Sequence, residues 1–453
     1  MTERLVVIGG DAAGMSAASQ ARRRADDLEI IAFEKGDYTS YAACGLPYYV
    51  ADFIDDENEL VARTPEEHRA NGIDVRLRHE VVAIHPEHRT VTVRDLDAAL
   101  NDTYTYDKLV IATGSKPIRP DLPGVEAIGV HGIQTIADGI ALRRHVDEID
   151  AGDRRAVVVG GGYIGLEMAE ALNERGMPVT VVDQKPQPML GALDADIAGM
   201  VADAMRGIGI DLRAETKVEG FGVDDDGRVR NVETDDGVIE ADIVVLGIGS
   251  QPNVDLARAA GITIGPSGGI AVDAHMRTSD ERIWACGDCV ESVHRITGKP
   301  MVIALGTHAN KQGRIVGINV TGGTERFRGV LGTAVTRICE YEIGRTGLTA
   351  YAASEAGMAY VTATIESTTR AGYFPGAESI TVKVVAEKAT GRLLGAQIIG
   401  KEGAAKRIDV LATALWAGLS VEEVENLDLG YAPPFSPVWD PVLIAARKAA
   451  AQI

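Results

Sequence analysis

Two stretches of the chain share one pattern of apolar and small residues. Each begins with a short apolar run, continues through a glycine-rich turn and ends in a segment with small residues at helical spacing: RLVVIGGDAAGMSAASQARRR from Arg4 and AVVVGGGYIGLEMAEALNERG from Ala156. The run predicts a buried strand and the periodic segment predicts a helix. A second apolar run follows each helix, LEIIAFE ending at Glu34 and PVTVVD ending at Asp183. The pattern therefore predicts a strand–turn–helix–strand unit that occurs twice.

The turns of these two units have the residues that a dinucleotide requires. Glycines allow a tight turn and close approach to a pyrophosphate, the helix N-terminus offers N–H groups, and the acid after the second strand accepts hydrogen bonds from a ribose. The second turn has the complete pattern, at Gly160, Gly162 and Gly165. In the first turn Asp11 stands between Gly9 and Gly14, where the pattern has its middle glycine. Because a carboxylate beside a pyrophosphate is unfavourable, we expect the Asp11 side chain to point away.

The rest of the chain has further strand and turn signals. YDKLVIATGS ends a strand at Thr113 and Gly114, and RIWACGDCVE contains a Gly-Asp pair at Gly287 and Asp288. From about Phe327 the glycine turns change character. The stretch SITVKVVAEKATGRLLGAQIIGKEGAAKRIDVLATALWAG, from Ser379, predicts two strands around a turn followed by a helix, and so a separate α+β domain. We therefore expect an α/β fold of two Rossmann-like dinucleotide-binding domains and a C-terminal α+β domain. The predicted segments are 1–120 and 249–326 for the first domain, 121–248 for the second and 327–453 for the third.

Composition and charge narrow the class of protein. The net charge of −21 disfavours nucleic acid and anionic membrane surfaces as partners, because their phosphates would be repelled. No apolar run approaches the ~20 residues that span a bilayer. Four widely spread cysteines do not form a disulfide framework. These features favour a cytoplasmic enzyme with no nucleic-acid or membrane partner.

The cysteines differ in their surroundings. Cys44 lies in SYAACGLPYY, between small residues and a Gly-Leu-Pro turn, and can be read as a reactive thiol or as a small buried hydrophobe. Cys286 and Cys289 form C-x-x-C, typical of a redox pair or half a metal site. No second such pair or paired histidines complete zinc ligation, so we expect a structural role and no metal. Cys339, in TRICEYEIG, is predicted to lie in an interior strand of the core.

Together these motifs resemble the FAD-dependent pyridine nucleotide–disulfide oxidoreductases over essentially the whole chain. Within that family the chain is most similar to the single-cysteine branch: coenzyme A disulfide reductases, NADH oxidases and NADH peroxidases. The resemblance implies an FAD domain in two segments, an inserted NAD(P)H domain and a C-terminal dimerisation domain. It also implies FAD and NADH as cofactors, with NADPH possible, and a homodimer.

The resemblance implies a set of cofactor contacts. Asp288 is similar to the aspartate that binds the FAD ribityl chain, Tyr163 to the tyrosine that covers the flavin until nicotinamide arrives, and Glu167 lies near the nicotinamide pocket. ALGTHANKQGR, from Ala304, resembles the segment whose helix N-terminus points at the isoalloxazine. The implied cofactor-binding residues are Gly9, Gly10, Asp11, Ala12, Ala13, Gly14, Glu34, Lys35, Val82, Thr113, Gly114, Gly160, Gly162, Tyr163, Ile164, Gly165, Glu167, Asp183, Gly249, Asp288 and Ala304.

Cys44 is the implied catalytic residue. Two-cysteine relatives have C-x-x-x-x-C at this place, but the fifth residue after Cys44 is Tyr49, so its redox partner is either a small thiol in a mixed disulfide or its own sulfenic acid. Tyr373 in GYFPG and Tyr431 in GYAPPF resemble the active-site tyrosines of the coenzyme A disulfide reductases, where a phenol can protonate a leaving thiolate. Ordinary interface packing is the alternative for both tyrosines.

Ala12 stands where the oxidases and peroxidases have a histidine, which favours a disulfide reductase. Three departures from the reductases leave the substrate open. Tyr41 replaces a phenylalanine, Ala43 an asparagine and Trp439 a lysine that some members have. The implied substrate contacts are Gln20, Arg23, Ser40 and His308.

The expected function is the NAD(P)H-dependent reduction of a small disulfide or persulfide through Cys44, with coenzyme A disulfide the preferred substrate. An NADH oxidase or peroxidase that reduces O2 or H2O2 through a cysteine sulfenic acid is the alternative, and a redox-sensing flavoprotein with little turnover is a third. Asp183 favours NADH over NADPH, because its carboxylate would repel a 2′-phosphate.

Overall fold

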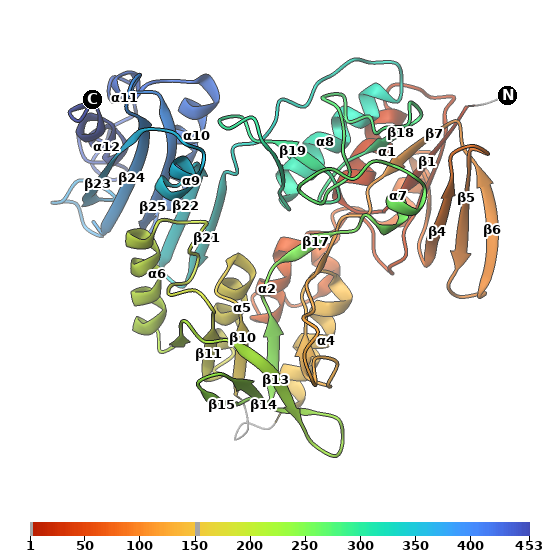
Figure 1. Ribbon diagram of the computed structural model, residues 1–453, viewed down its shortest axis with the longest axis horizontal. Coiled ribbons are helices and arrows are strands. Elements are labelled where there is room, and N and C mark those ends of the chain that lie inside the picture. The colour runs from red at the N-terminus through yellow and green to blue at the C-terminus, as the bar shows by residue number, and fades with distance from the viewer. Residues whose placement is uncertain (1–2, 150–154) are drawn as a thin grey trace. The chain divides into compact units, whose positions relative to one another are not determined.

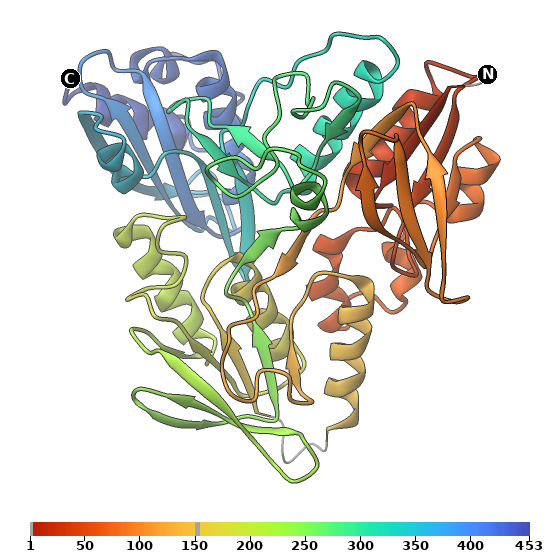
Figure 2. The same ribbon diagram turned by 45° about the vertical axis from the view of Figure 1, so that its right-hand side comes forward.

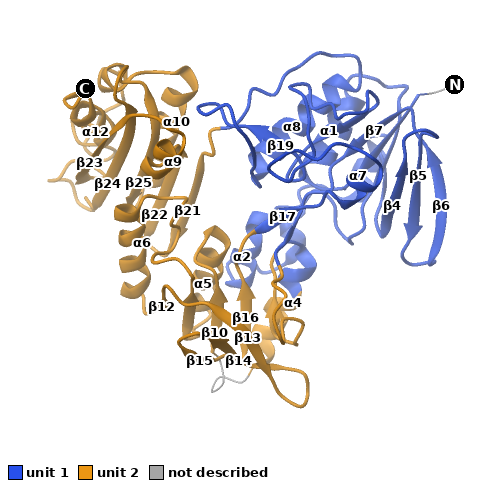
Figure 3. Ribbon diagram, viewed as in Figure 1, with its two compact units in different colours: residues 1–118, 134–140, 250–330 blue, residues 119–133, 141–249, 331–453 orange. Residues whose placement is uncertain are grey.

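The structure, a computed structural model, describes residues 3–149 and 155–453. The chain divides into two compact units (Figure 3). Unit 1 comprises Met1–Ile118, Gln134–Ile140 and Ser250–Val330. Unit 2 comprises Arg119–Ile133, Ala141–Gly249 and Leu331–Ile453.

Unit 1 is built on a five-stranded parallel sheet with the order β18-β7-β1-β2-β3. Figure 1 labels β18, β7 and β1 of this sheet. Its apolar strands are almost wholly buried, as expected for a parallel sheet covered on both faces. The strands are β1 (Arg4–Ile8), β2 (Glu29–Phe33), β3 (Asp74–Arg76), β7 (Lys108–Ile111) and β18 (Ile283–Ala285).

Helices α1 (Ala12–Arg22) and α8 (Gly306–Asn319) lie side by side in unit 1 (Figures 1 and 2). Their close approach depends on glycine, because a Cβ at Gly313 would lie 2.2 Å from the Ala13 carbonyl oxygen. The short helices of unit 1 are η1 (Ala43–Gly45), α2 (Leu46–Val50), η2 (Glu57–Leu60), α3 (Pro65–Ala70) and α7 (Asp255–Ala259). Its second sheet is antiparallel and consists of β4 (His79–His85), β5 (Thr90–Asp95) and β6 (Leu100–Thr105). Two strand pairs also belong to the unit: β8 (Ser115–Pro117) with β17 (Ser250–Pro252), and β19 (Glu291–Val293) with β20 (Pro300–Val302).

Unit 2 contains a second parallel sheet, with the order β12-β11-β10-β16-β9. It is the predicted second copy of the strand–turn–helix–strand pattern. Its elements are β9 (Val130–His131), β10 (Ala156–Val159), α5 (Tyr163–Glu174), β11 (Val179–Val182), α6 (Ala195–Gly207), β12 (Asp211–Arg213) and β16 (Ile243–Leu246). The antiparallel strands β13 (Val218–Val223), β14 (Val229–Thr234) and β15 (Gly237–Glu240) accompany it, and α4 (Ile136–Glu148) begins in unit 1 and ends in unit 2.

The C-terminal part of unit 2 is an antiparallel sheet with the order β21-β22-β25-β24-β23. The predicted strand–turn–strand–helix of residues 379–417 is present as β24, β25 and α10. The elements are β21 (Ala334–Ile338), β22 (Tyr341–Gly347), α9 (Ala350–Glu355), β23 (Tyr360–Thr368), β24 (Ser379–Glu387), β25 (Leu393–Gly400), α10 (Ala404–Ala417), α11 (Val421–Glu425) and α12 (Pro441–Ala450).

A buried polar cluster joins the second parallel sheet to this C-terminal sheet. Asp194, which precedes α6, accepts a hydrogen bond from Gln397 at 2.7 Å and forms an ion pair with Lys383 at 3.0 Å. It also accepts the N–H of Ala350 at the start of α9. The side chains of Asp194, Gln397 and Lys383 are all buried, so these contacts hold the start of α6 against β24 and β25.

The fold class is confirmed: two parallel-sheet, Rossmann-like domains and a C-terminal domain with an antiparallel sheet and helices. The domain boundaries stay predictions. The prediction for Cys339 is wrong, because this residue lies in the hairpin turn between β21 and β22, half-buried and with a φ of +49°. Cys339 and Glu340 form a two-residue turn between the strands that end at Ile338 and begin at Tyr341. The pattern of apolar residues in the sequence does not distinguish this turn from a continuous strand.

Candidate functional site

The first glycine turn forms a cradle with no room for side chains. A Cβ at Gly9, whose φ is +108°, would lie 2.1 Å from the carbonyl oxygen of Ala112. A Cβ at Gly14 would lie 2.0 Å from the carbonyl oxygen of Gly9. The turn therefore needs glycine at both places, and α1 begins directly after Asp11 of this turn. These features fit the pyrophosphate of a dinucleotide.

The acids after the second strands hold the two glycine turns in the same way. Glu34 accepts the N–H of Gly10 at 2.7 Å, and Asp183 accepts the N–H of Gly161 at 2.7 Å. In both units the carboxylate is thus positioned beside the turn where a ribose would lie. The equivalence supports the prediction that both units bind a nucleotide.

The first glycine turn also holds the segment that leads to Cys44. The carbonyl oxygen of Gly10 accepts the hydroxyl of Thr39 at 2.5 Å and the N–H of Ser40 at 3.0 Å. The carboxylate of Asp11 accepts the N–H of Tyr41 at 3.0 Å. Three consecutive residues are therefore bonded to the turn, and Cys44 follows three positions later.

The Asp11 side chain is accordingly directed to the Tyr41 backbone. Burial raises the pKa of Asp11 to about 6, although the N–H groups of Tyr41 and Ala12 oppose the rise. The carboxylates of Glu34 and Asp288 add to it. Sequence reasoning expected this side chain to point away from the pyrophosphate, but it did not identify Tyr41 as its partner.

Cys44 is exposed at the start of a short helix. It lies within η1, and α2 follows directly with Pro47 in its first turn. Tyr49, which occupies the position of the second cysteine in two-cysteine relatives, is buried, and its hydroxyl donates to Glu57 at 3.2 Å. The exposed Cys44 thiol is accessible to a substrate from solution. It cannot form the internal disulfide of the two-cysteine relatives, because residue 49 is a tyrosine.

The later segments of unit 1 interlock around two of the predicted FAD contacts. The hydroxyl of Thr113 donates to the Asn253 carbonyl oxygen at 2.7 Å, and the Asn253 amide returns a bond to the Thr113 carbonyl oxygen at 2.8 Å. Asp288 accepts the hydroxyl of Ser115 at 3.3 Å, and burial raises the pKa of this carboxyl. Sequence reasoning missed Asn253, although the GSQPN turn after β16 was a signal for it.

The predicted substrate contacts occupy three places in unit 1. Gln20 and Arg23 lie at the end of α1, where the guanidinium donates to the Gln20 amide oxygen at 3.5 Å. His308 lies in the first turn of α8, and burial lowers its pKa to about 4. Ser40 lies beside the first glycine turn and contacts His68. The structure thus brings Gln20 to Arg23 and Ser40 to His68, a residue that sequence reasoning missed.

The second glycine turn, in unit 2, is as tightly built as the first. A Cβ at Gly165 would lie 1.8 Å from the Gly160 carbonyl oxygen. Asp183 also accepts the N–H of Lys185 at 2.9 Å, while the Lys185 ammonium donates to the Leu190 carbonyl oxygen at 2.7 Å. The Lys185 ammonium group therefore donates to a backbone carbonyl oxygen, while its backbone N–H donates to the Asp183 carboxylate.

Helix α5 places two further predicted contacts against the C-terminal sheet. Tyr163 begins the helix; its hydroxyl is buried without a hydrogen-bond partner among the described residues, and burial raises its pKa to about 12. Glu167 accepts the hydroxyl of Thr336 at 3.0 Å, and burial raises the pKa of its carboxyl. A strand of the C-terminal sheet thus supports a residue predicted to lie near nicotinamide.

The two predicted catalytic tyrosines form a pair in unit 2. Tyr373 is 78% exposed and Tyr431 is 48% exposed. They share a hydrogen bond that raises the pKa of Tyr431. The N–H of Ala371 donates to the Pro433 carbonyl oxygen at 3.0 Å, which joins the two loops. Segments that lie far apart in the sequence therefore present two phenols together at the surface.

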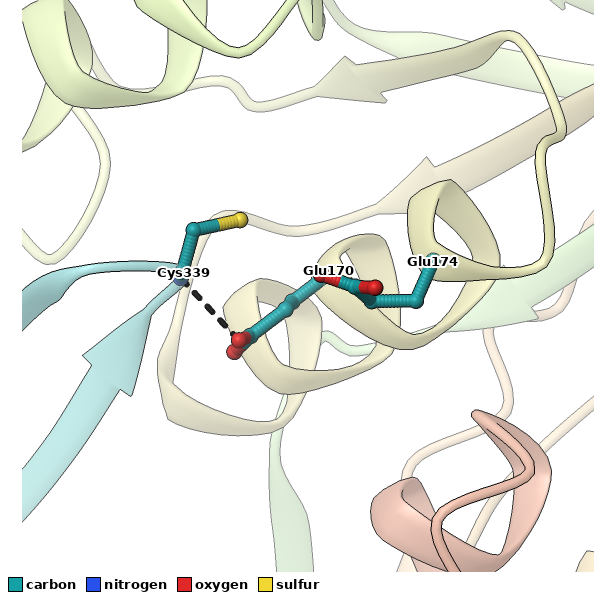
Figure 4. A group of neighbouring side chains, drawn as sticks. All are labelled: Glu170, Glu174 and Cys339. Atoms are coloured by element: carbon teal, nitrogen blue, oxygen red, sulfur yellow. Dashed lines mark hydrogen bonds between the residues drawn. The ribbon is translucent and has the colours of Figure 1, made fainter.

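The remaining cysteines differ from Cys44. Cys286 and Cys289 are fully buried, and burial raises the pKa of both thiols. Cys339 donates its N–H to Glu170 at 3.0 Å, with Glu174 one helical turn away (Figure 4). Glu170 also forms an ion pair with Arg337 at 3.4 Å. Raised thiol pKa values make these cysteines poor nucleophiles.

Two other predicted cofactor residues, Val82 and Gly249, lie at irregular places of the backbone. Val82 lies at an irregularity of β4, where the register shifts between Val81 and Ala83. Gly249 has a φ of +104° and precedes β17. The assignments of all predicted site residues, including Ala12, Ala13, Lys35, Ile164 and Ala304, stay predictions.

The fold contains two glycine turns, each with an acid beside it, that fit dinucleotides. The family described as pyridine nucleotide-disulphide oxidoreductase matches residues 3–313, and its dimerisation domain matches residues 333–441. The chain belongs to this family. The expectations of FAD and NAD(P)H as cofactors and of an enzyme are confirmed.

Individual relatives are similar over the whole chain. An "NAD(P)H coenzyme A polysulfide/persulfide reductase" of Pyrococcus horikoshii is 37% identical, with 99% of this chain and 98% of the relative covered. An "NADH oxidase" of Methanocaldococcus jannaschii is 35% identical, with 98% of each chain covered. The solved structure of an NAD-dependent persulfide reductase from A. fulgidus has a TM-score of 0.95 at 39% identity, covering 99% of this chain and 83% of that one.

The chain is an NAD(P)H-dependent oxidoreductase of the persulfide and coenzyme A disulfide reductase type. Among the described residues, none of the helices has the length and apolar character needed to cross a membrane.

Proposed function

We propose that the chain reduces a small disulfide or persulfide, with coenzyme A disulfide as the preferred substrate, through Cys44 as its only redox-active cysteine. The observation that carries the proposal is the exposure of Cys44 on a segment bonded to the first glycine turn. The other three cysteines have raised thiol pKa values. Cys44 is therefore the thiol best suited to react with a disulfide, because it is exposed to solvent and the other three thiols ionise less readily.

The chemistry balances with one cysteine. The Cys44 thiolate attacks one sulfur of the disulfide, forms a mixed disulfide and releases the first thiolate. When bound, FAD would carry two electrons from NAD(P)H to this mixed disulfide, which releases the second thiolate and restores Cys44. The phenols of Tyr373 and Tyr431 are suited to protonate a departing thiolate. Overall, NAD(P)H, one proton and one disulfide yield NAD(P)⁺ and two thiols.

Stopped-flow measurements on Cys44→Ser test the proposal. NADH should still bleach the flavin at the wild-type rate, while turnover of coenzyme A disulfide is lost. Cys339→Ser is the matched control, since its thiol is half-buried in a hairpin turn of unit 2, and it should retain turnover. Disulfide turnover in Cys44→Ser would overturn the proposal.

The relative named NADH oxidase supports a second candidate, in which Cys44 cycles through a sulfenic acid to reduce O2 or H2O2. Ala12, the first residue of α1, opposes it because an alanine cannot assist peroxide cleavage as a histidine could. Steady-state rates with O2, H2O2 and coenzyme A disulfide distinguish the two.

A further inference from the structure

The backbone of Ser40 is held in an uncommon conformation. Its φ is +50°, in the left-handed region that a residue with a Cβ seldom adopts. Its N–H donates to the Gly10 carbonyl oxygen at 3.0 Å, and its own carbonyl oxygen accepts the N–H of Ala62 at 2.8 Å. Because both backbone groups are engaged, the direction in which the side chain leaves the backbone is set by the surrounding structure.

The Ser40 hydroxyl contacts His68. The distance from the hydroxyl oxygen to Nε2 of His68 is 2.9 Å. His68 is only 1% exposed and lies in α3, whose start is fixed by a capping box between Thr64 and Glu67. Burial lowers the pKa of His68 to about 4, with Arg63 adding to the effect. The ring is therefore neutral at pH 7 and has a single N–H.

The second ring nitrogen indicates where that hydrogen lies. Nδ1 of His68 is buried and has no hydrogen-bond partner among the described residues. An N–H at Nδ1 would be a buried donor without an acceptor, whereas an N–H at Nε2 donates to the Ser40 oxygen. The Nε2–H tautomer is therefore favoured. In this tautomer the Ser40 hydroxyl oxygen accepts the hydrogen bond from His68. The hydroxyl hydrogen of Ser40 has no acceptor among the described residues and can donate to a ligand.

We propose that His68 is a positioning residue that presents the Ser40 hydroxyl as a hydrogen-bond donor to an anionic acceptor of the substrate that reacts at Cys44. Ser40 is half-buried and lies four positions before the exposed Cys44, on the segment that the first glycine turn holds. The acceptor is either a sulfur that gains charge as the disulfide is cleaved or a phosphate oxygen of coenzyme A. The inference rests on the proposed function.

Four variants of the holoenzyme test it: Ser40→Ala, His68→Leu, His68→Gln and the double variant Ser40→Ala/His68→Leu. A glutamine amide can place an N–H close to the position of Nε2. We expect Ser40→Ala and His68→Leu each to lower kcat/KM for coenzyme A disulfide about tenfold, as for one lost hydrogen bond to a charged group, and His68→Gln to stay within about threefold of wild type. The double variant should lose no more than Ser40→Ala, since both changes remove the same interaction.

Two substrates identify the acceptor. The disulfide of pantetheine has the thiol end of coenzyme A without its 3′- and 5′-phosphates. If Ser40 serves the sulfur, both disulfides lose rate in Ser40→Ala. If it serves a phosphate, KM rises for coenzyme A disulfide alone. Either result supports the positioning of a donor by His68.

The reduction of ferricyanide by NADH, which needs no Cys44, and the melting temperature are the controls. A merely structural His68 would change the melting temperature and both activities alike, and its effects would add to those of Ser40→Ala. If His68→Leu reduces the disulfide at the wild-type rate, the inference about His68 is overturned but the proposed function is not. Absence of disulfide turnover in the wild-type enzyme would instead contradict the proposed function.

Discussion

The carboxylate of Asp11 accepts the backbone N–H of Tyr41 at 3.0 Å, which joins the first glycine turn to the segment before Cys44. Asp11 stands where the dinucleotide pattern has its middle glycine, so this bond is not available to chains that keep the glycine. The departure from the pattern thus has a structural consequence close to the reactive thiol. One residue contributes both to the nucleotide turn and to the position of the Cys44 segment.

Asp11→Ala should therefore slow disulfide reduction more than Asp11→Asn. An asparagine still offers an oxygen to the Tyr41 N–H, whereas an alanine offers none. At pH 7 we expect kcat/KM for the disulfide to fall about tenfold in Asp11→Ala, as for one lost hydrogen bond to a charged group, and to fall less in Asp11→Asn. Flavin content and the reduction of ferricyanide by NADH serve as controls. Equal rates in the two variants would show that the bond does not matter for catalysis.

The pH dependence of stability should change with the same residue. Burial raises the pKa of Asp11 to about 6, above its unfolded value of about 3.9. Between these values the folded protein binds more protons than the unfolded one, so the contribution of Asp11 to stability decreases as the pH rises through this range. The melting temperature of Asp11→Asn relative to wild type should rise from pH 5 to pH 7. A difference independent of pH would contradict the raised pKa.

NADH should be preferred over NADPH by about tenfold or more in kcat/KM. Asp183 presents its carboxylate beside the second glycine turn, and the Lys185 ammonium is bonded to the Leu190 carbonyl oxygen instead of facing a phosphate. A 2′-phosphate would therefore meet an uncompensated negative charge. Asp183→Ala should reduce the ratio, and Lys185→Ala, the matched control, should leave it within twofold. A tenfold preference for NADPH in the wild type would refute this assignment.

The active site should be shared between subunits of a homodimer. We expect the pair formed by Tyr373 and Tyr431 to act on Cys44 of the partner subunit, because the chain has the dimerisation domain of its family. Cys44→Ser and Tyr373→Phe/Tyr431→Phe subunits should be mixed under exchange conditions. A heterodimer would contain one complete site and one site without any of the three groups, so activity should rise above that of either parent.

Exchange must be verified by tagging the two variants differently. If activity stays at the parental level despite exchange, the tyrosines act within their own subunit or take no part. A monomer in sedimentation experiments at working concentration would contradict the shared site directly.

The buried ion pair of unit 2 should contribute to stability above the titration range of its acid. Burial alone would raise the pKa of Asp194, but hydrogen bonds from Gln397, Ala350 and Lys383 lower it overall. Its stabilising effect is therefore fully present above the unfolded pKa of about 3.9 and is lost as the pH falls through the lower folded pKa. Lys383→Met should cost about 3 kcal/mol at pH 7, because it leaves a buried carboxylate without its cation.

Thermal melting of Lys383→Met and of Lys383→Met/Asp194→Asn measures this contribution. The double variant should recover part of the loss, since the buried position 194 then has no charge, while Asp196, the second carboxylate paired with Lys383, is exposed to water. An equal loss in both variants would indicate that packing of the Lys383 methylene groups, and not its charge, stabilises the contact.

The sequence by itself determined the repeated strand–turn–helix–strand pattern and most of the chemistry. Glycine spacing and the acids at Glu34 and Asp183 are local features, because a tight turn and the end of a strand depend on residues within one supersecondary unit. The motif around Cys44 is local too: small residues and a Gly-Leu-Pro turn lie within ten positions, and the resemblance that predicts a catalytic role for Cys44 rests partly on them.

Only the tertiary structure decided which residues support these local motifs. His68 contacts Ser40 across 28 positions, and Asn253 locks Thr113 across 140. No periodicity or spacing relates such residues, because their proximity depends on how helices and strands pack. Cys339 was assigned wrongly for a related reason: a two-residue hairpin turn between apolar strands has the same local pattern as a continuous strand. The pairing of β21 with β22 places this residue in a turn.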